Sequence, residues 1–364
     1  MKKIYYIGLD VHKDNTQMAV LETKAKEPVA VKVIDSDPVK VAKAILPYTK
    51  EGTVHVGYEA GCMGYTLYRV LTGMKIDCQI IAPNKVFRGG NNEKIKTDKR
   101  DAAAIAWMLR RDEGAGIAVP EREDEAARDL LRCRGDMQDD LKRAKQRLLK
   151  YLLRHGHMYE NTRYWTGKHK KWMKTLVFEM PVDKAVFEQY LSTIESIEER
   201  VGRVDLQIKE IAESPRYAER VRKFRAFKGV DYIIALSLVC EIGDFKRFPT
   251  AAAFMSYIGL VPSEYSSGKK RKQGGITKTG NGHIRRLLTE AAWHYTRPAK
   301  VSLRLAARRV GTAEWVISYA DRAVHRLHGK YLKLVFKGKS KQVVVTAVAR
   351  ELSGFLWGVM TGIA

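Results

Sequence analysis

Cysteine is scarce in this sequence, which excludes the disulfide-rich and zinc-clustered classes of small protein. The four cysteines among 364 residues are scattered, with no CxxC pair and no paired histidine nearby: Cys62, Cys78, Cys133 and Cys240. Disulfide frames and zinc sites need cysteines at short, regular spacings. We therefore interpret these four as small core residues in a reducing compartment.

Long apolar runs are also lacking. No window approaches 18 uncharged apolar residues, about the length that a helix needs to cross a bilayer, so we expect no membrane span. The apolar stretch after Lys2 and Lys3 is short and runs into Asp10, unlike a secretory signal. Both observations favour a cytoplasmic protein.

Acidic residues are few relative to basic ones. The sequence has 66 Lys and Arg against 41 Asp and Glu, a formal net charge of +25. This excess is larger than solubility requires and indicates a polyanionic partner such as nucleic acid. The alternative is a basic protein with no such partner. The length suggests two or three domains, and 45% hydrophobic residues can build their cores.

Four acids stand out against this basic background. Asp10 ends a strand pattern in KKIYYIGLDVHKD, and Glu59 ends another in TVHVGYEA. Asp98 and Asp101 begin a helical pattern in KTDKRDAAAIAWMLRR, where their spacing of three places both on one helix face. Clustered carboxylates repel one another unless a hard cation neutralises them, and Mg²⁺ prefers oxygen ligands. The four therefore predict a metal centre for phosphodiester chemistry, although any one of them alone is more often a turn or cap residue.

Periodicity predicts a mixed α/β fold for the N-terminal third. We expect strands at 4–9, 17–22, 29–35, 53–58 and 76–82, and helices at 38–50, 63–73 and from a cap at Thr97. This order is the ribonuclease-H-like layout, a mixed sheet covered by helices. The Gly- and Asn-rich basic loop at 83–96 is expected to move or to contact nucleic acid.

The middle of the chain is predicted to be helical and basic. Apolar spacing from 124 to 156 and from 181 to 212 suits a helical hairpin or a coiled-coil seam. Residues 141–175 hold eleven Lys or Arg and one acid, interleaved with Tyr159, Tyr164, Trp165 and Trp172. Such a segment can hold phosphates and stack on unpaired bases, and a solvated helix face with core aromatics is the alternative. The nucleic-acid contacts predicted here are Lys168, Lys170, Lys171 and Lys174.

The C-terminal third offers a second candidate centre at Ser266–Ser267–Gly268. A serine hydroxyl can attack phosphorus if a base takes its proton and cations stabilise the charge. Residues 267–288 carry seven Lys or Arg and no acid, and the predicted contacts are Lys269, Lys270, Arg271, Lys278, Arg285 and Arg286. Most such triplets are simply turns, and Tyr265 is a competing nucleophile. Upstream, FKGVDYIIALSLVCEIGDFKRF resembles a helix–hairpin–helix, which aims backbone N–H groups at phosphate.

Several of these motifs occur together in one known family. In chain order GLDVHK, YEA, KTDKRDA, GLVPSEYSSG and ITKTGNGHIRRLL resemble the IS-one-ten insertion-sequence transposases, relatives of the Piv/MooV DNA invertases. The resemblance covers nearly the whole chain. It implies a RuvC-like DEDD nuclease domain at 1–125, a helical, coiled-coil-like basic domain at 126–220, and a mainly helical serine transposase domain at 221–364.

The resemblance also implies residue roles and partners. The tetrad becomes Asp10, Glu59, Asp98 and Asp101, which hold Mg²⁺, and the nucleophile becomes the serine directly before Gly, here Ser267 with Ser266 beside it. The family motif usually written Ser-Lys reads Thr277-Lys278 here. The implied partners are donor DNA, target DNA, a structured bridge RNA and further copies of the chain, as a dimer or tetramer with a composite site, at the nucleoid of a prokaryotic cell.

The expected function is RNA-guided DNA recombination through a covalent serine–DNA link. Two alternatives remain open: a hydrolytic RuvC-like junction resolvase without a covalent intermediate, and a non-catalytic RNA- or DNA-binding protein that keeps a vestigial tetrad. The intact set of four acids argues against the binding protein. The serine region separates the first two, because a resolvase needs no serine there.

Overall fold

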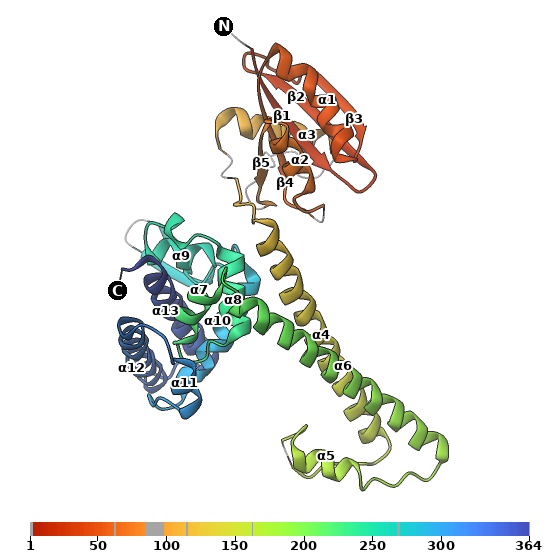
Figure 1. The fold of residues 1–364 in the computed structure, drawn as a ribbon, viewed down its shortest axis with the longest axis vertical. Helices are drawn as coiled ribbons and strands as arrows, with labels where there is room; N and C mark the ends of the chain where they lie inside the picture. Colours follow the sequence, from red (N-terminus) through yellow and green to blue (C-terminus); the bar gives the residue numbers. More distant parts are fainter. Residues whose placement is uncertain are drawn as a thin grey trace. The chain divides into compact units, whose positions relative to one another are not determined.

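The computed structural model describes residues 3–61, 63–83, 98–113, 116–161, 163–267 and 270–363, with the backbone alone at 98–99, 265–267 and 270–272. The chain forms two compact units, Met1–Val119 and Pro120–Ala364. Figure 1 shows a sheet with helices in the first unit and an almost wholly helical second unit. The protein is therefore mixed α/β, with a central mixed sheet and a helical C-terminal region.

The first unit is built on a five-stranded sheet in the order β3-β2-β1-β4-β5. Strands β1, β2 and β3 pair antiparallel, while β4 runs parallel to β1 and β5 runs parallel to β4. All five predicted strands are confirmed, at β1 (Lys3–Val11), β2 (Asn15–Glu22), β3 (Ala30–Asp35), β4 (Gly52–Glu59) and β5 (Asp77–Ile81).

Helices cover both faces of this sheet. On one face α1 (Pro38–Glu51) and α2 (Thr66–Gly73) pack in one hydrophobic cluster with the sheet, and α3 (Asp98–Arg111) contributes to a separate cluster. The carboxylate of Asp37 caps α1 by accepting the N–H groups of Val39 and Lys40 at 2.9 Å. The predicted cap Thr97 and all but Pro83 of the 83–96 loop lie outside the described residues.

Alternate side chains of strand β1 point to opposite faces of the sheet and so belong to different hydrophobic clusters. Tyr5, Ile7 and Leu9 are buried in the cluster that contains α1 and α2. Tyr6 packs on the opposite cluster with α3, and Gly8 follows on the same face. A Cβ built at Gly8 would lie 2.0 Å from the carbonyl oxygen of Ala102. Helix α3 therefore lies directly on the backbone of β1, a contact that only glycine permits.

The second unit begins with a long helical hairpin. Helices α4 (Arg122–Arg154) and α6 (Pro181–Glu213) pack side by side (Figure 1). Leu148 of α4 shares one buried cluster with Ile194 of α6, and Leu131 shares another with Ile208. The hairpin predicted from apolar spacing is confirmed, with the short helix α5 (Gly167–Met173) in the connection between the two long helices.

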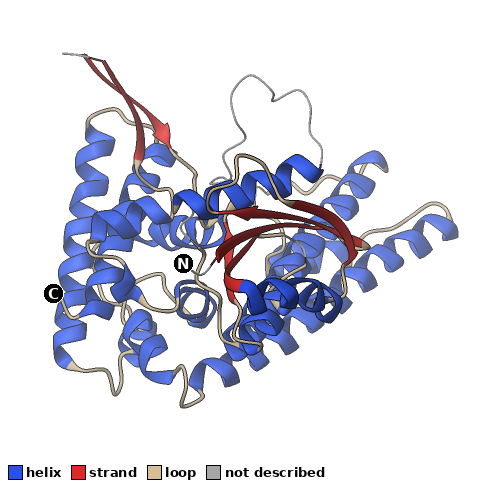
Figure 2. Cartoon of the chain, turned by 90° about the horizontal axis from the view of Figure 1, so that it is seen from above, coloured by secondary structure: helices blue, strands red, loops and turns tan. Residues whose placement is uncertain are grey.

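Further helices follow, and all but α11 contribute to the main core of this unit. They are α7 (Ala218–Arg225), α8 (Tyr232–Ile242), α9 (Ala251–Tyr257), α10 (Gly282–Ala292), α11 (Leu303–Arg308), α12 (Glu314–Phe336) and α13 (Lys341–Thr361), with 3₁₀ turns at Phe245–Arg247 and Trp293–Thr296. The serine pair ends strand β6 (Pro262–Ser267), which pairs antiparallel with β7 (Lys270–Ile276) (Figure 2).

Helix α13 is the most apolar long helix among the described residues. By length and composition it could cross a membrane, although Arg350 and Glu351 interrupt it, so it is not an uncharged apolar run of the kind excluded above. Its most apolar window is 56% buried within the protein, and Val348, Leu352 and Leu356 are fully buried in the main cluster. A helix buried on most of its surface is apolar nearly all round, which explains the pattern.

Candidate functional site

The register between β1 and β4 places two of the predicted acids next to each other at the sheet edge. Leu9 lies opposite Tyr58 in this parallel pair, so the next residues, Asp10 and Glu59, stand at the carboxyl ends of neighbouring strands. Ligand sites in sheets with parallel strands form preferentially at such ends. The strand pairing therefore places both acids at the same edge of the sheet.

Alternation assigns both acids to the α3 face of the sheet. Asp10 follows Tyr6 and Gly8 on that face of β1. Glu59 shares its face of β4 with Gly57, where an added Cβ would lie 3.0 Å from a methyl carbon of Leu109 in α3. The intervening residue Tyr58 is buried on the opposite side with α1 and α2.

The other two acids begin the helix that lies on this face. Helix α3 begins at Asp98, and Asp101 lies one turn later. The buried residues Ala102 and Ile105 are four residues after Asp98 and Asp101, and positions four apart share one side of a helix. The sheet-facing stripe of α3 thus continues to both acids. The structure describes the half-buried side chain of Asp101 but only the backbone of Asp98.

Asp10 has a histidine partner. The Nε2 atom of His12 lies 3.1 Å from Oδ2 of Asp10, whose side chain is 16% exposed. The backbone N–H of His12 donates to the carbonyl of Asn15 at 3.0 Å and so closes the β1–β2 turn. The turn therefore fixes the imidazole beside the carboxylate. His12 and its neighbour Lys13 follow Asp10 closely in the sequence, a position compatible with a phosphate contact or with a role in the turn.

The donor chemistry of these acids suits a hard divalent cation, because carboxylate oxygens are the ligands that such ions prefer. Across the ranges that the structure describes, no group of three or more His, Cys, Asp or Glu side chains is arranged to hold a metal ion. This statement covers Asp10, Glu59 and Asp101 but not Asp98, whose side chain the structure does not describe. Strand register and helix position thus bring the acids to one side of the sheet, and their donor type fits a metal.

The second predicted centre lies at the end of the β6–β7 hairpin. Ser266 pairs in register with Arg271, and Ser267 with Lys270, and these four positions are described by backbone alone. Lys269 lies outside the described residues. Ser267 is the last residue of its strand, which places it next to the connection between β6 and β7.

The other cations predicted around this serine have different surroundings. Arg285 donates through Nη1 to the carbonyls of Ile258 at 3.0 Å and Thr279 at 3.1 Å, so it braces the backbone before and after the hairpin. Lys278 is exposed, with a left-handed φ of 56°. Arg286 is exposed and pairs with Glu290 at 3.5 Å.

In the middle segment the predicted lysines are exposed. Lys168, Lys170 and Lys171 lie on α5, and Lys174 follows its last turn. Lys170 forms an ion pair with Glu198 of α6 at 3.2 Å, and Glu198 also binds Lys145 at 2.6 Å. One of the four therefore ties α5 to the hairpin.

The aromatic residues of this segment surround a buried histidine. His169 has 0% exposure, and four rings lie 4.8–5.4 Å from it, those of Tyr159, Tyr164, Trp165 and Trp172. Neither ring nitrogen of His169 has a hydrogen-bond partner among the described residues, and burial lowers its pKa. The aromatics thus pack on one another, as the core alternative predicted, while Tyr164 keeps 45% of its surface exposed.

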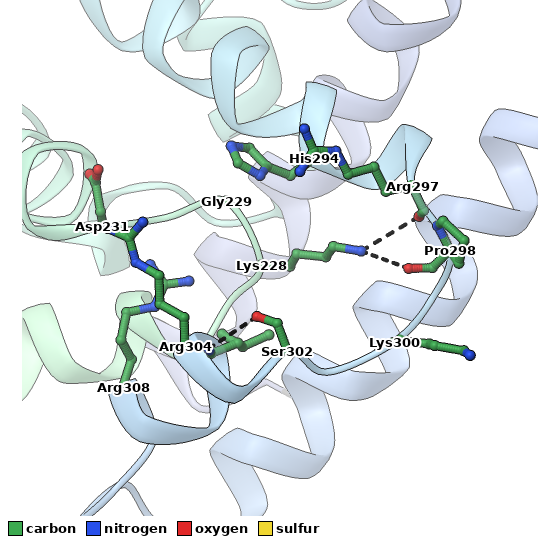
Figure 3. A pocket seen from close by; sticks show the side chains of 11 residues that line it. Lys228, Gly229, Asp231, His294, Arg297, Pro298, Lys300, Ser302, Arg304 and Arg308 are labelled. Atoms are coloured by element: carbon green, nitrogen blue, oxygen red, sulfur yellow. Dashed lines mark hydrogen bonds between the residues drawn. The ribbon is translucent and has the colours of Figure 1, made fainter. Parts of the chain in front are cut away.

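One cationic site was missed by the sequence reading. A cavity of about 450 Å³ in the second unit is lined by residues from two distant segments, among them Lys228, Arg297, Lys300, Arg304 and Arg308 (Figure 3). The available signal was the segment 297–308, RPAKVSLRLAAR, which holds four cations and no acid.

Comparison with known proteins covers both units. Residues 7–156 match a transposase family profile of the IS110 DEDD type, and residues 221–304 match the profile described as transposase IS116/IS110/IS902 family. The chain is 38% identical to the transposase for insertion sequence element IS1533 of Leptospira borgpetersenii, over 93% of this chain and 99% of that protein. It is 34% identical to the putative transposase y4qE of Sinorhizobium fredii (strain NBRC 101917 / NGR234), over 97% and 88%. A transposase for insertion sequence element IS1111A of Coxiella burnetii is 27% identical over 80% of this chain and 78% of that protein.

Proposed function

The chain belongs to the IS116/IS110/IS902 family of insertion-sequence transposases, and we propose that it cuts and rejoins DNA with a Mg²⁺-binding acid tetrad and a serine nucleophile. Membership implies DNA cutting and rejoining, and the DEDD type implies a divalent metal ion. The observation that carries the proposal is the placement of Asp10, Glu59, Asp98 and Asp101 at two neighbouring strand ends and the first turn of the helix above them.

The first unit is proposed to have the ribonuclease-H-like, RuvC-type fold. Three antiparallel strands followed by two parallel ones, in the order β3-β2-β1-β4-β5, support this assignment. We propose domains at 1–125, 126–220 and 221–364. The division between the two compact units after Val119 lies near the first of these boundaries.

In the proposed mechanism the four acids would hold Mg²⁺, and the bound ion would supply neutralisation of charge on the scissile phosphate. His12 orients the Asp10 carboxylate through the contact described above. The Oγ atom of Ser267 attacks phosphorus and loses its proton to a base, so that a Ser267–phosphate bond forms. The bond from phosphorus to the leaving deoxyribose oxygen breaks, and that oxygen takes up a proton. The phosphoserine link conserves the bond energy, and attack by a new DNA hydroxyl releases the serine.

The proposed partners are donor DNA, target DNA and a structured bridge RNA. With a net charge of +25, the chain can hold nucleic-acid backbones while base pairing reads the sequence. The proposed contacts are Lys168, Lys170, Lys171, Lys174, Lys269, Lys270, Arg271, Lys278, Arg285 and Arg286. A site composed from two domains fits a homo-oligomer, a dimer or tetramer, at the nucleoid in the cytoplasm of a prokaryotic cell.

Adduct trapping tests the covalent step. Wild type, Ser267→Ala and the matched control Ser266→Ala are incubated with radiolabelled element-end DNA, the bridge RNA and Mg²⁺, and are then denatured. We expect a protein-linked DNA band in the wild type and the control but not in Ser267→Ala, with the nucleotide on Ser267 by mass spectrometry. A nucleotide on Ser266 or Tyr265 would overturn the assignment. Strand cleavage without an adduct would favour the hydrolytic resolvase, and binding without cleavage would favour the non-catalytic protein.

A further inference from the structure

The cationic cavity of the second unit lies outside both proposed centres. It has a volume of about 450 Å³. Figure 3 shows Lys228 and Gly229 in the turn that precedes α8. Facing them are His294, in the 3₁₀ turn that follows α10, and Arg297 and Pro298 just after that turn. Arg304 and Arg308 lie on α11. The cavity therefore joins parts of the chain that are about seventy residues apart.

Positive charge dominates the lining of the cavity. Five cations line it, Lys228, Arg297, Lys300, Arg304 and Arg308, against a single acid, Asp231. The Asp231 carboxylate accepts the Ile234 N–H at 3.2 Å as the cap of α8. Within the described part of the chain, none of the five cations has a carboxylate within 4.0 Å.

Several other cations of the second unit form ion pairs with carboxylates. Arg309, the residue after Arg308, pairs with Asp321 at 2.8 Å. Lys330 is bonded to Glu351 at 2.5 Å, and Arg326 pairs with the same carboxylate. These cations are compensated by carboxylates, whereas the five that line the cavity are not, within the residues that the structure describes. Arg304 and Arg308 also lie four apart on one helix, where like charges destabilise each other.

The two half-buried cations, Lys228 and Arg308, keep N–H groups that donate no hydrogen bond within the described residues. Lys228 donates through Nζ to the carbonyls of Pro298 at 2.8 Å and Arg297 at 3.5 Å, which leaves one of its three N–H groups. Arg308 donates through Nη1 to the carbonyl of Val230 at 2.8 Å. Its Nε is buried, and no acceptor in the described residues reaches it. Such an arrangement leaves N–H groups for an anionic acceptor.

The positive charge around the cavity helps to lower the pKa values of two groups that line it. Burial and the neighbouring Arg297 lower the pKa of Lys228. Burial lowers the pKa of His294, and Arg297, Lys228 and Arg308 lower it further. An anion in the cavity would relieve the repulsion among these groups.

Gly229 allows the wall of the cavity to form. It has a φ of 83°, a conformation that favours glycine. An added Cβ would lie 2.5 Å from the carbonyl oxygen of Ala291 in α10. The turn between α7 and α8 can therefore approach α10 closely enough to hold Lys228 opposite Arg297. This is the glycine turn of the helix–hairpin–helix-like segment.

We propose that this cavity binds a phosphate group of a nucleic-acid backbone, as an anchoring contact separate from the tetrad and the serine. Lys228 and Arg308 are half-buried and would hold the phosphate, whereas Arg297, Lys300 and Arg304 are exposed and would reach neighbouring phosphates along the strand. Phosphate contacts position a nucleic acid without reading its sequence. The proposal rests on the proposed function only in that a transposase has nucleic acid as its partner.

Binding measurements test the contact without requiring cleavage. The variant Arg297→Gln/Lys300→Gln/Arg304→Gln removes three exposed charges and leaves Lys228 and Arg308 in place. The control Lys337→Gln/Lys339→Gln/Lys341→Gln removes three exposed charges elsewhere in the same unit. Each is titrated with two fluorescent DNA duplexes of unrelated sequence by anisotropy, in EDTA, at several salt concentrations.

We expect the cavity variant to bind both duplexes at least about tenfold more weakly than wild type, and the control to change little. Each lost phosphate contact lowers the salt slope by about 0.9. If all three are lost, the fall in affinity between about 50 and 200 mM salt should be roughly 40-fold smaller than for wild type. Equal losses in the cavity variant and the control would overturn the proposal, whatever the outcome for the tetrad or Ser267.

A second arm separates backbone phosphate from free phosphate. Thermal unfolding of wild type and of the cavity variant is followed with inorganic phosphate, and with chloride at equal ionic strength. If inorganic phosphate stabilises both proteins and the cavity variant keeps its DNA affinity, the cavity is a site for small anions and the nucleic-acid assignment is wrong. Weaker DNA binding by the cavity variant, together with stabilisation of both proteins by phosphate held at Lys228 and Arg308, supports the backbone contact.

Discussion

Gly8 of β1 lies directly beneath Ala102 of α3. A Cβ at position 8 would be 2.0 Å from the Ala102 carbonyl oxygen and 2.5 Å from the Ala106 nitrogen. Gly8 is two residues before Asp10 on the same face of the strand, and Ala102 directly follows Asp101. The distance between the β1 acid and the α3 acid is therefore controlled by the absence of a side chain at one position.

Replacement of Gly8 should affect both stability and cleavage. Gly8→Ala places a methyl group against helix backbone, which cannot give way as a flexible side chain can, so α3 must move from the sheet. We expect a loss of about 1–3 kcal/mol in the free energy of unfolding, together with a loss of DNA cleavage at temperatures where the variant remains folded. Denaturant unfolding and strand-cleavage assays measure the two effects.

Gly73→Ala is the matched control, because an added Cβ there meets no atom within 4 Å. It should keep both stability and cleavage. A Gly8→Ala protein with wild-type cleavage would show that the close contact between β1 and α3 does not set the geometry of the acids.

Asp101→Asn should separate folding from catalysis. The amide has nearly the same shape as the carboxylate but lacks its charge, so metal affinity should fall while α3 remains in place. We expect cleavage to be lost and DNA binding in EDTA to persist. The exposed Asp112, just beyond the end of α3, provides the control Asp112→Asn. Calorimetric titration with Mg²⁺ would contradict the tetrad if both variants bound the ion as wild type does.

The lysines of α5 should contribute unequally to RNA binding. Lys170 is engaged with Glu198, whereas the exposed Lys168, Lys171 and Lys174 have no carboxylate within 4.0 Å in the described part of the chain. We expect Lys168→Gln/Lys171→Gln/Lys174→Gln to weaken RNA binding and to lower the salt slope by up to about 2. Lys170→Gln alone should change the slope less.

Filter binding of the bridge RNA across a salt series measures these slopes. The variant Lys337→Gln/Lys339→Gln/Lys341→Gln again controls for loss of net charge. If the α5 variant and this control had the same slope as wild type, the segment would be a solvated helix face, the alternative that its composition also allowed.

Sequence periodicity was sufficient to predict the strands that carry Asp10 and Glu59 and the long helices of the second unit. The strands that carry Asp10 and Glu59 alternate between buried and less buried positions as far as Ile7 and Val56, and α4 and α6 carry long apolar stripes. Both signals are local and strong. The neighbouring placement of Asp10 and Glu59 depends on the parallel register of β1 and β4, and the approach of α3 depends on Gly8, so these relationships could be expected only from the fold type.

Features that depend on long-range contacts were not predicted. The β6–β7 hairpin is polar and Gly-rich in PSEYSS and KRKQGGI, so it lacks the alternation that marks a half-buried strand. The cationic cavity joins Lys228 to residues 297–308, and no local pattern relates segments so far apart. The histidine at position 169 reads as part of a basic run, although the structure buries it among aromatic rings.

His169 should make the stability of the middle segment depend on pH. Its side chain is buried, its ring nitrogens have no partner among the described residues, and burial lowers its pKa below 6.5. In the unfolded chain the imidazole takes up a proton near pH 6.5, while the folded segment resists that proton. Its stabilising contribution is therefore complete above about pH 6.5 and is lost as the pH falls toward the lowered folded pKa, by at most about 1.4 kcal/mol per pH unit.

His169→Phe should remove this dependence, because phenylalanine fills the aromatic cluster without a titrating group. At neutral pH we expect the variant to be as stable as wild type or more stable, since no unsatisfied ring nitrogen remains buried. Hydrogen exchange of peptides covering 163–174, measured at several values between about pH 5 and 7 and corrected for intrinsic exchange, reports the local stability. Replacement of the exposed His325 by Phe controls for loss of an imidazole. Parallel curves for wild type and His169→Phe would show that His169 does not resist protonation in the folded protein.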